Sequence, residues 1–166
     1  LNEHTKPEEV ERLLPLFDNG NDVGLITEAG LPAVADPGSQ LVKLCHRHNI
    51  EVVPCSGPSS LMLALMGSGL NGQSFAFLGY IPAKTDERRQ ALKSIEKHSA
   101  SAHQTKIMIE TPYRTDSLFA DILNVCQGST ELCVAAEITM PDAYIMTKTV
   151  AEWKRYVAGK EAIIGK

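Results

Sequence analysis

The sequence predicts an α/β protein of two lobes, with a doubly wound parallel sheet in the first lobe and a mixed sheet in the second. Three observations support this fold class. Segments with the apolar pattern of strands alternate with segments of helical pattern along the chain. The segment "VGLIT" is of the continuous apolar type found in strands buried on both faces of a parallel sheet. Two later strand patterns follow each other with no helix between them, which indicates a mixed sheet.

The first lobe is predicted to open with a helix. Thr5 and Glu8 have the spacing of a capping box, and apolar side chains follow at helical spacing as far as Phe17. Pro15 should kink or shorten this helix. The apolar strand at 23–27 comes next.

A second helix is expected after a long loop, because Asp36 can cap it and Pro37 suits its first position. The segment "IEVVP" (50–54) is predicted to be the next strand, and "SLMLALMGSGL" (60–70) the next helix. This order of helices, strands and loops predicts the doubly wound sheet.

The glycine-rich segment 67–73 is the best candidate for a boundary, which divides the chain into lobes at 1–71 and 72–166. The elements expected in the second lobe are strand 74–81, helix 85–98, strand 105–110, helix 115–126, strands 131–138 and 143–149, and a helix capped at Thr149–Glu152.

Composition limits the classes of function. The chain has 166 residues and a formal net charge of −4, so it lacks the basic excess of a non-specific nucleic-acid binder. No apolar run has the length of a membrane span, and no membrane partner is expected. The four cysteines form no C-x-x-C pair and are interpreted as thiols in a reducing cytoplasm. No metal site is expected.

Three loops follow the carboxyl ends of predicted strands, where ligands bind in open α/β sheets: 28–38, 55–60 and 110–114. Glycine lets the backbone approach a ligand closely, and proline fixes the shape of the loop in advance. Helix N-termini behind Asp36 and Pro58 add donors that suit a carboxylate. The loops therefore predict a nucleotide-like cofactor held mainly by backbone groups, although ordinary strand-to-helix turns have similar compositions.

Motifs of other enzyme classes are absent from the sequence. No G-x-G-x-x-G follows a strand, and neither a Walker A motif nor G-x-S-x-G occurs. Methyl transfer from S-adenosylmethionine fits a site with few reactive side chains, since the sulfonium is already electrophilic and the enzyme mainly holds donor and nucleophile in line. A base can help to deprotonate a hydroxyl nucleophile.

Collinear motifs resemble one family over nearly the whole chain. "TEAGLPAVADPG" resembles the "S-D-A-G-T-P-x-x-S-D-P-G" signature of the tetrapyrrole-methylase-like superfamily, and more narrowly the branch of bacterial small-subunit ribosomal RNA 2′-O-ribose (cytidine) methyltransferases. The other segments similar to that branch are "VVPCSGPSSLMLALMGSGL", "FLGYIPAKTDERRQAL", "ETPYR" and "AAEITM".

The resemblance implies S-adenosylmethionine bound between two α/β lobes, a cytoplasmic homodimer, and ribosomal RNA or the small ribosomal subunit as partner. It also implies a truncated paralogue, lacking an N-terminal strand and loop and cut within a final strand at "EAIIGK". Two alternatives stay open. One is a methyltransferase acting on a small molecule such as a tetrapyrrole, and the other is a non-catalytic cofactor-binding or dimerisation module.

Several residues depart from the pattern of that branch. Glu28 replaces Asp, Leu31 replaces Thr, Ala35 replaces Ser, and Ala136 replaces the Arg before Glu137. These changes suggest a paralogue that keeps the fold and the methyl donor but differs in its acceptor.

The matched positions give the candidate site residues. Glu28 and Glu137 are candidate catalytic groups, although Glu28 is equally suited to capping nearby N–H groups. The candidate cofactor-binding residues are Gly30, Leu31, Pro32, Asp36, Pro58, Ser59, Ser60, Glu110 and Tyr113.

Three arginines have open roles. Arg114 is a candidate for clamping a substrate phosphate or carboxylate, and a salt bridge to Glu110 is the alternative. Arg88 and Arg89 lie on a predicted helix, where a solvated face is favoured over contact with nucleic acid.

Overall fold

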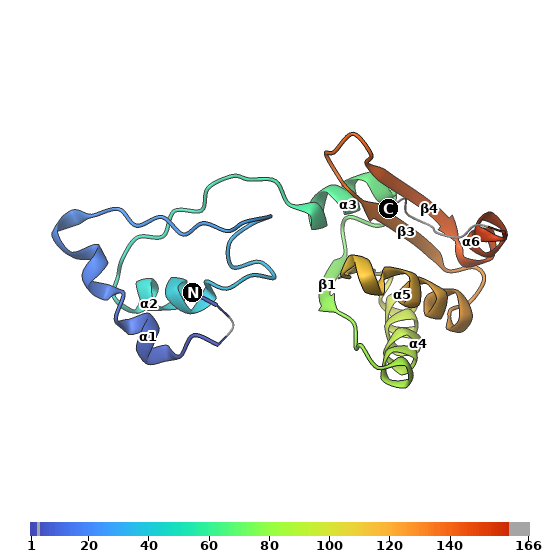
Figure 1. The fold of residues 1–166 in the computed structure, drawn as a ribbon, viewed down its shortest axis with the longest axis horizontal. Coiled ribbons are helices and arrows are strands. Elements are labelled where there is room, and N and C mark those ends of the chain that lie inside the picture. The colour runs from blue at the N-terminus through green and yellow to red at the C-terminus, as the bar shows by residue number, and fades with distance from the viewer. Residues whose placement is uncertain (3, 160–166) are drawn as a thin grey trace. The chain divides into compact units, whose positions relative to one another are not determined.

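The computed structural model describes residues 1–2 and 4–159. The chain divides into two compact units, with the boundary between Ser59 and Ser60 (Figure 1). Each unit is described by itself. The predicted lobe boundary at residue 71 stays a prediction. No helix within the described ranges has both the length and the apolar character needed to cross a bilayer.

The described residues of the first unit form three short helices: α1 (Pro7–Glu11), a 3₁₀ helix (Leu14–Gly20) and α2 (Ser39–Arg47). The long helix expected before residue 18 is thus interrupted near Pro15, as its sequence predicted. Val10 of α1 packs against a buried stripe on α2, and this small core holds the unit together. The buried residues of that stripe are Leu41, Leu44 and Cys45.

The capping interaction at α1 lies one residue later than expected. The Glu9 carboxylate accepts a hydrogen bond from the Lys6 N–H at 2.8 Å, so the predicted pairing of Thr5 with Glu8 is wrong. The hydroxyl of Thr5 instead accepts from the Asn2 N–H at 2.8 Å.

The two strands predicted in the first unit do not form. Residues 23–27 and 50–54 belong to no strand, and no sheet occurs among the described residues up to 59. A strand needs a neighbouring backbone for its N–H and C=O groups, and these segments lack one here. Ile26 and Val53 are accordingly 89% and 70% exposed. The doubly wound parallel sheet is therefore not observed in this unit.

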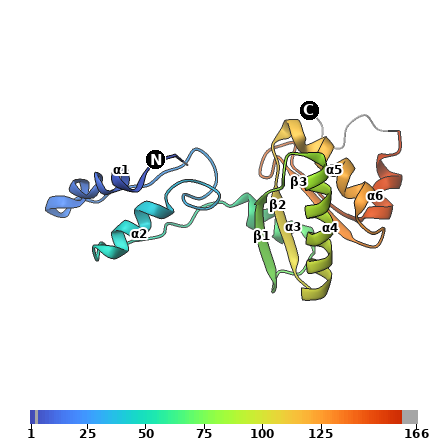
Figure 2. The same ribbon diagram turned by 90° about the horizontal axis from the view of Figure 1, so that it is seen from below.

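The second unit carries the α/β architecture and confirms the mixed α/β fold class. Its elements are α3 (Ser60–Ser68), β1 (Phe75–Tyr80), α4 (Thr85–Ala102), β2 (Thr105–Ile109), α5 (Pro112–Val125), β3 (Glu131–Ala136), β4 (Tyr144–Thr149) and α6 (Val150–Val157). β1 and β2 pair in parallel (Figure 2), while β3 and β4 pair antiparallel (Figure 1). Most of these elements lie within a few residues of their predicted bounds.

The core of the second unit is built on α4, α5 and α6. Trp153 and Val150 of α6 are fully buried and lie with Phe119 of α5 and Leu92 of α4 in one cluster. The rings of Trp153 and Phe119 meet edge to face, 5.3 Å apart at their centroids. The Trp153 indole N–H also donates to the Leu132 carbonyl at 2.8 Å, so it ties α6 to β3.

The N-terminus of α6 has the predicted capping box. The Glu152 N–H donates to the Thr149 hydroxyl at 3.2 Å, and the Thr149 N–H donates to the Glu152 carboxylate at 2.9 Å. Hydrogen bonds from the Thr149 backbone and side chain hold the pKa of Glu152 below its ordinary range.

We expect Thr149→Ala to destabilise the protein by about 1 kcal/mol, because it leaves an N–H in the first turn of α6 without a partner. Urea unfolding followed by circular dichroism measures this loss. Thr149→Ser keeps the hydroxyl and serves as the control. If both variants lost the same stability, the methyl group of Thr149, and not its capping hydroxyl, would be the cause.

Candidate functional site

The loop 28–38 of the first unit has an unusual backbone. Four of its residues adopt positive φ values in or near the left-handed region, which only glycine enters without strain. These residues are Gly30 (75°), Ala33 (63°), Ala35 (55°) and Gly38 (140°). Strained backbone of this kind is held by its surroundings and is common at ligand-binding loops.

Within the part of the chain that the structure describes, most peptide groups of this loop form no backbone hydrogen bond. In the segment 28–36, the described backbone–backbone hydrogen bond runs from the Val34 N–H to the Leu31 carbonyl at 3.2 Å. The Thr27 hydroxyl donates to the Ala29 carbonyl at 3.3 Å. Among the described residues, the remaining N–H and C=O groups of 28–36 have no backbone partner.

The first two predicted loops meet inside the first unit. A Cβ on Gly57 would lie 3.1 Å from Cδ2 of Leu31, so the Leu31 side chain packs on the backbone of the second loop. A Cβ on Gly30 would meet nothing within 4 Å. Pro58 is exposed and Ser59 is half-buried. The side chain of Leu31 is therefore structural, whereas the backbone at Gly30 is accessible.

Asp36 does not cap a helix as the sequence predicted. α2 begins at Ser39 with Gly38 in the N-cap position and without a side-chain cap. With Asp36 as the N-cap, Gly38 would have to be helical, but its φ of 140° lies far outside the helical range. The helix therefore begins only at Ser39, with Gly38 as its N-cap. Asp36 and Pro32 are half-buried in the loop, while Glu28 is exposed.

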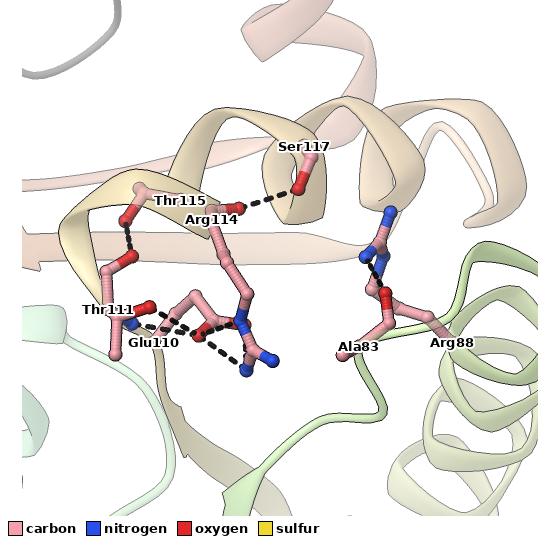
Figure 3. A network of polar contacts seen from close by, with 7 residues as sticks. All are labelled: Ala83, Arg88, Glu110, Thr111, Arg114, Thr115 and Ser117. Atoms are coloured by element: carbon pink, nitrogen blue, oxygen red, sulfur yellow. Dashed lines mark hydrogen bonds and ion pairs between the residues drawn. The ribbon is translucent and has the colours of Figure 1, made fainter.

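The third predicted loop, 110–114, is in fact the junction of β2 and α5, since its last three residues already belong to the helix. A dense polar cluster lies at this junction (Figure 3). Arg114 donates from Nε to Oε1 of Glu110 at 2.8 Å and from Nη2 to Oε2 at 2.9 Å. The Thr111 N–H donates to the same carboxylate at 2.8 Å. The salt bridge between Arg114 and Glu110 is thus present, and the carboxylate also complements the N-terminus of α5.

Two of the predicted residues line one cavity of the second unit. This cavity has a volume of about 260 Å³ and lies between α3, β2 and β3. Ser60 at the start of α3 and Glu110 at the end of β2 both border it, and Ile138 lies after β3 at its edge. The fold therefore brings Ser60 and Glu110 together, although 50 residues of sequence numbering separate them.

The other candidates of the second unit are exposed. Glu137 follows β3 with a φ of 48° and an exposed side chain. Tyr113 in the first turn of α5 is 84% exposed. Glu137 directly follows the carboxyl end of β3, and Tyr113 lies four residues after the end of β2.

Sequence reasoning missed a buried ion cluster beside this edge. Asp121 of α5, only 3% exposed, accepts from Nε of Arg88 at 2.7 Å and from Nε of Arg89 at 2.7 Å. Arg88 also donates from Nη1 to the Ala83 carbonyl at 2.8 Å (Figure 3). The predicted solvated face is therefore wrong for Arg88, which is buried.

Burial raises the pKa of Asp121, but the hydrogen bonds and charges of Arg89 and Arg88 outweigh it and hold the pKa below its ordinary range. The sequence contained a signal for this cluster. Asp121 lies among the apolar positions Leu118 and Ile122 of an amphipathic helix, and a buried carboxylate needs a cationic partner.

Comparison with known proteins identifies the family to which the chain belongs. The model of the tetrapyrrole (corrin/porphyrin) methylases matches residues 1–154. A curated relative from Vibrio cholerae, named ribosomal RNA small subunit methyltransferase I, is 34% identical over 158 residues, covering 95% of this chain and 54% of the relative. A relative of the same name from Thermotoga maritima is 36% identical over 139 residues, covering 84% of this chain and 60% of the relative. The chain spans about half the length of the curated relatives it matches.

Proposed function

Because the chain belongs to the tetrapyrrole (corrin/porphyrin) methylase family, we propose that it is a methyltransferase that uses S-adenosylmethionine and methylates a ribose 2′-oxygen of small-subunit ribosomal RNA. The family match over residues 1–154 is the observation that carries this proposal. The names of the relatives favour ribosomal RNA over a tetrapyrrole as the acceptor. We extend the proposal to a homodimer acting in the cytoplasm on ribosomal RNA or the small ribosomal subunit.

The loop of the first unit fits the chemistry of this cofactor. S-adenosylmethionine carries a nucleoside and an amino-acid group, which need many hydrogen-bonding partners, and the peptide groups of 28–36 are largely unused. We assign the backbone of Gly30, Leu31 and Pro32 to its binding. The further cofactor-binding assignments are Asp36, Pro58, Ser59, Ser60, Glu110 and Tyr113.

The bound cofactor supplies a methyl group activated by the sulfonium, so the protein's own residues need only orient the acceptor and accept its proton. Glu28 and Glu137 are exposed carboxylates and are the proposed proton acceptors. The ion pair with Glu110 fixes the Arg114 guanidinium and leaves its Nη1 for a substrate phosphate or carboxylate.

Gly30→Ala tests the cofactor site, and the chain supplies a matched control. Gly30 and Gly20 have φ values of 75° and 74°, and an added Cβ meets nothing within 4 Å at either position. Both alanine variants therefore suffer the same backbone strain, but only Gly30 lies in the loop. Isothermal titration calorimetry with S-adenosylmethionine should show affinity weakened about tenfold or more for Gly30→Ala, equivalent to about 1.4 kcal/mol, and unchanged for Gly20→Ala.

Two outcomes contradict the proposal. No binding of S-adenosylmethionine or of its demethylated product by the unaltered full-length protein would exclude a methyltransferase. Binding without transfer of radiolabelled methyl to small-subunit ribosomal RNA would exclude this acceptor.

A further inference from the structure

Resting on the proposed function, we propose that Arg89 binds a phosphate of the RNA backbone and that Asp121 orients it for this contact. Arg89 lies in the second turn of α4. The site consists of one exposed guanidinium, one buried carboxylate and the neighbouring buried Arg88.

Asp121 contacts only the Nε side of the Arg89 guanidinium. The Nε of Arg89 donates to Oδ1 of Asp121 at 2.7 Å, and its side chain remains 46% exposed. Within the described residues, neither Nη nitrogen of Arg89 has a hydrogen-bond partner. One hydrogen bond thus restrains the direction of this half-exposed side chain, and its two Nη nitrogens keep their donors for a ligand.

The cluster carries surplus positive charge, and that charge lies at Arg89. One carboxylate serves two guanidinium groups. All three guanidinium nitrogens of Arg88 have a partner, since Nε and Nη2 contact Oδ2 of Asp121 and Nη1 donates to the Ala83 carbonyl. Arg88 is buried, so only Arg89 can present the excess charge to a ligand.

A pre-oriented guanidinium is well suited to phosphate. Its planar fork of N–H donors matches two phosphate oxygens, and a free arginine side chain would lose considerable rotamer entropy on binding. The hydrogen bond to Asp121 removes part of that cost before RNA arrives. A lysine on a solvated helix face has neither the planar fork of donors nor a fixed orientation.

The surroundings of Arg89 favour RNA over a free anion. Arg88 ties α4 to Ala83, in the loop that follows the carboxyl end of β1. Tyr80 is the last residue of β1 and is 59% exposed, at the same edge as the end of β2. Exposed aromatic rings and arginines together bind single-stranded nucleic acid by stacking and charge, and here α4, which carries Arg89, follows the strand that ends at Tyr80.

The experiment compares Arg89→Gln, Arg89→Lys and the control Lys97→Gln in the full-length protein. Lys97 is an exposed cation on the same helix, eight positions further along, and its replacement changes the net charge equally. The probe is transcribed small-subunit ribosomal RNA. Binding is measured by filter retention across a salt series, and methyl transfer with S-adenosylmethionine gives KM and kcat.

Arg89→Gln should raise KM for the RNA about 5- to 10-fold with kcat nearly unchanged, as expected for one lost charged contact. Its plot of log K against log salt concentration should be shallower by about 0.7 to 0.9, because one fewer counterion is released. Arg89→Lys should recover the salt slope but only part of the affinity. Affinity for S-adenosylmethionine and the behaviour of Lys97→Gln should match the unaltered protein.

The outcomes separate this inference from the proposed function. In a protein that methylates RNA, two results would refute the role of Arg89 and leave the function standing. One is that Arg89→Gln keeps the KM and the salt slope of the unaltered protein. The other is that Lys97→Gln weakens RNA binding as much as Arg89→Gln does. If the protein binds S-adenosylmethionine but no RNA, both the RNA acceptor and this inference are refuted.

Discussion

Replacing Asp121 with asparagine should lower the free energy of unfolding by about 3–5 kcal/mol, because it leaves the charge of the buried Arg88 without a counter-ion. Trp153 is the single tryptophan of the chain and lies in the core of the second unit, so its fluorescence during urea unfolding reports on the affected region. Asp116→Asn on the same helix is the control. Asp116 is exposed, and its replacement should change stability by less than about 0.5 kcal/mol.

The pH dependence identifies the carboxylate as the cause. The native pKa of Asp121 lies below its ordinary value of 3.8, so as the pH falls the unfolded chain binds a proton at this group before the native chain does. Its contribution to stability is complete above about pH 5 and is lost as the pH falls through 3.8 toward the native pKa. The difference in the free energy of unfolding between the unaltered protein and Asp121→Asn should therefore become smaller as the pH is lowered. If this difference in the free energy of unfolding stayed constant down to about pH 3, an ionic role of Asp121 would be contradicted.

Trp153→Ala should cost about 3–5 kcal/mol, since it removes a fully buried ring and leaves a cavity between α5, α6 and β3. Trp153→Phe keeps most of the ring contact with Phe119 but loses the hydrogen bond to Leu132, and should cost about 1–3 kcal/mol. Far-UV circular dichroism is the readout because both variants lose the fluorophore.

The control for this series is Tyr113→Ala, which removes an aromatic ring that is 84% exposed. It should change stability by less than about 0.5 kcal/mol. A loss at Trp153→Ala no larger than at Tyr113→Ala would show that α6 does not contribute to the core.

Short-range patterns predicted the second unit well. The capping pair Thr149 and Glu152 and the strand around Ile107 depend on residues close in sequence, and both are observed. α5 begins earlier than predicted because Pro112 occupies its first position, where a missing N–H has no cost. The predicted loop at 110–114 does follow a strand, but only Glu110 and Thr111 lie between β2 and α5, because the helix already begins at Pro112.

The amino-acid sequence by itself determined the α/β class, the order of elements in the second unit and the family, since periodicity, capping and motif spacing are properties of neighbouring residues. Only the tertiary structure decided that 23–27 and 50–54 form no strands, that α2 begins at Ser39, and that Asp121 meets two arginines more than 30 positions away. The physical reason is that strand pairing and buried charge compensation each need a partner from elsewhere in the chain. Local sequence can show that such a partner is required but cannot show which one is supplied.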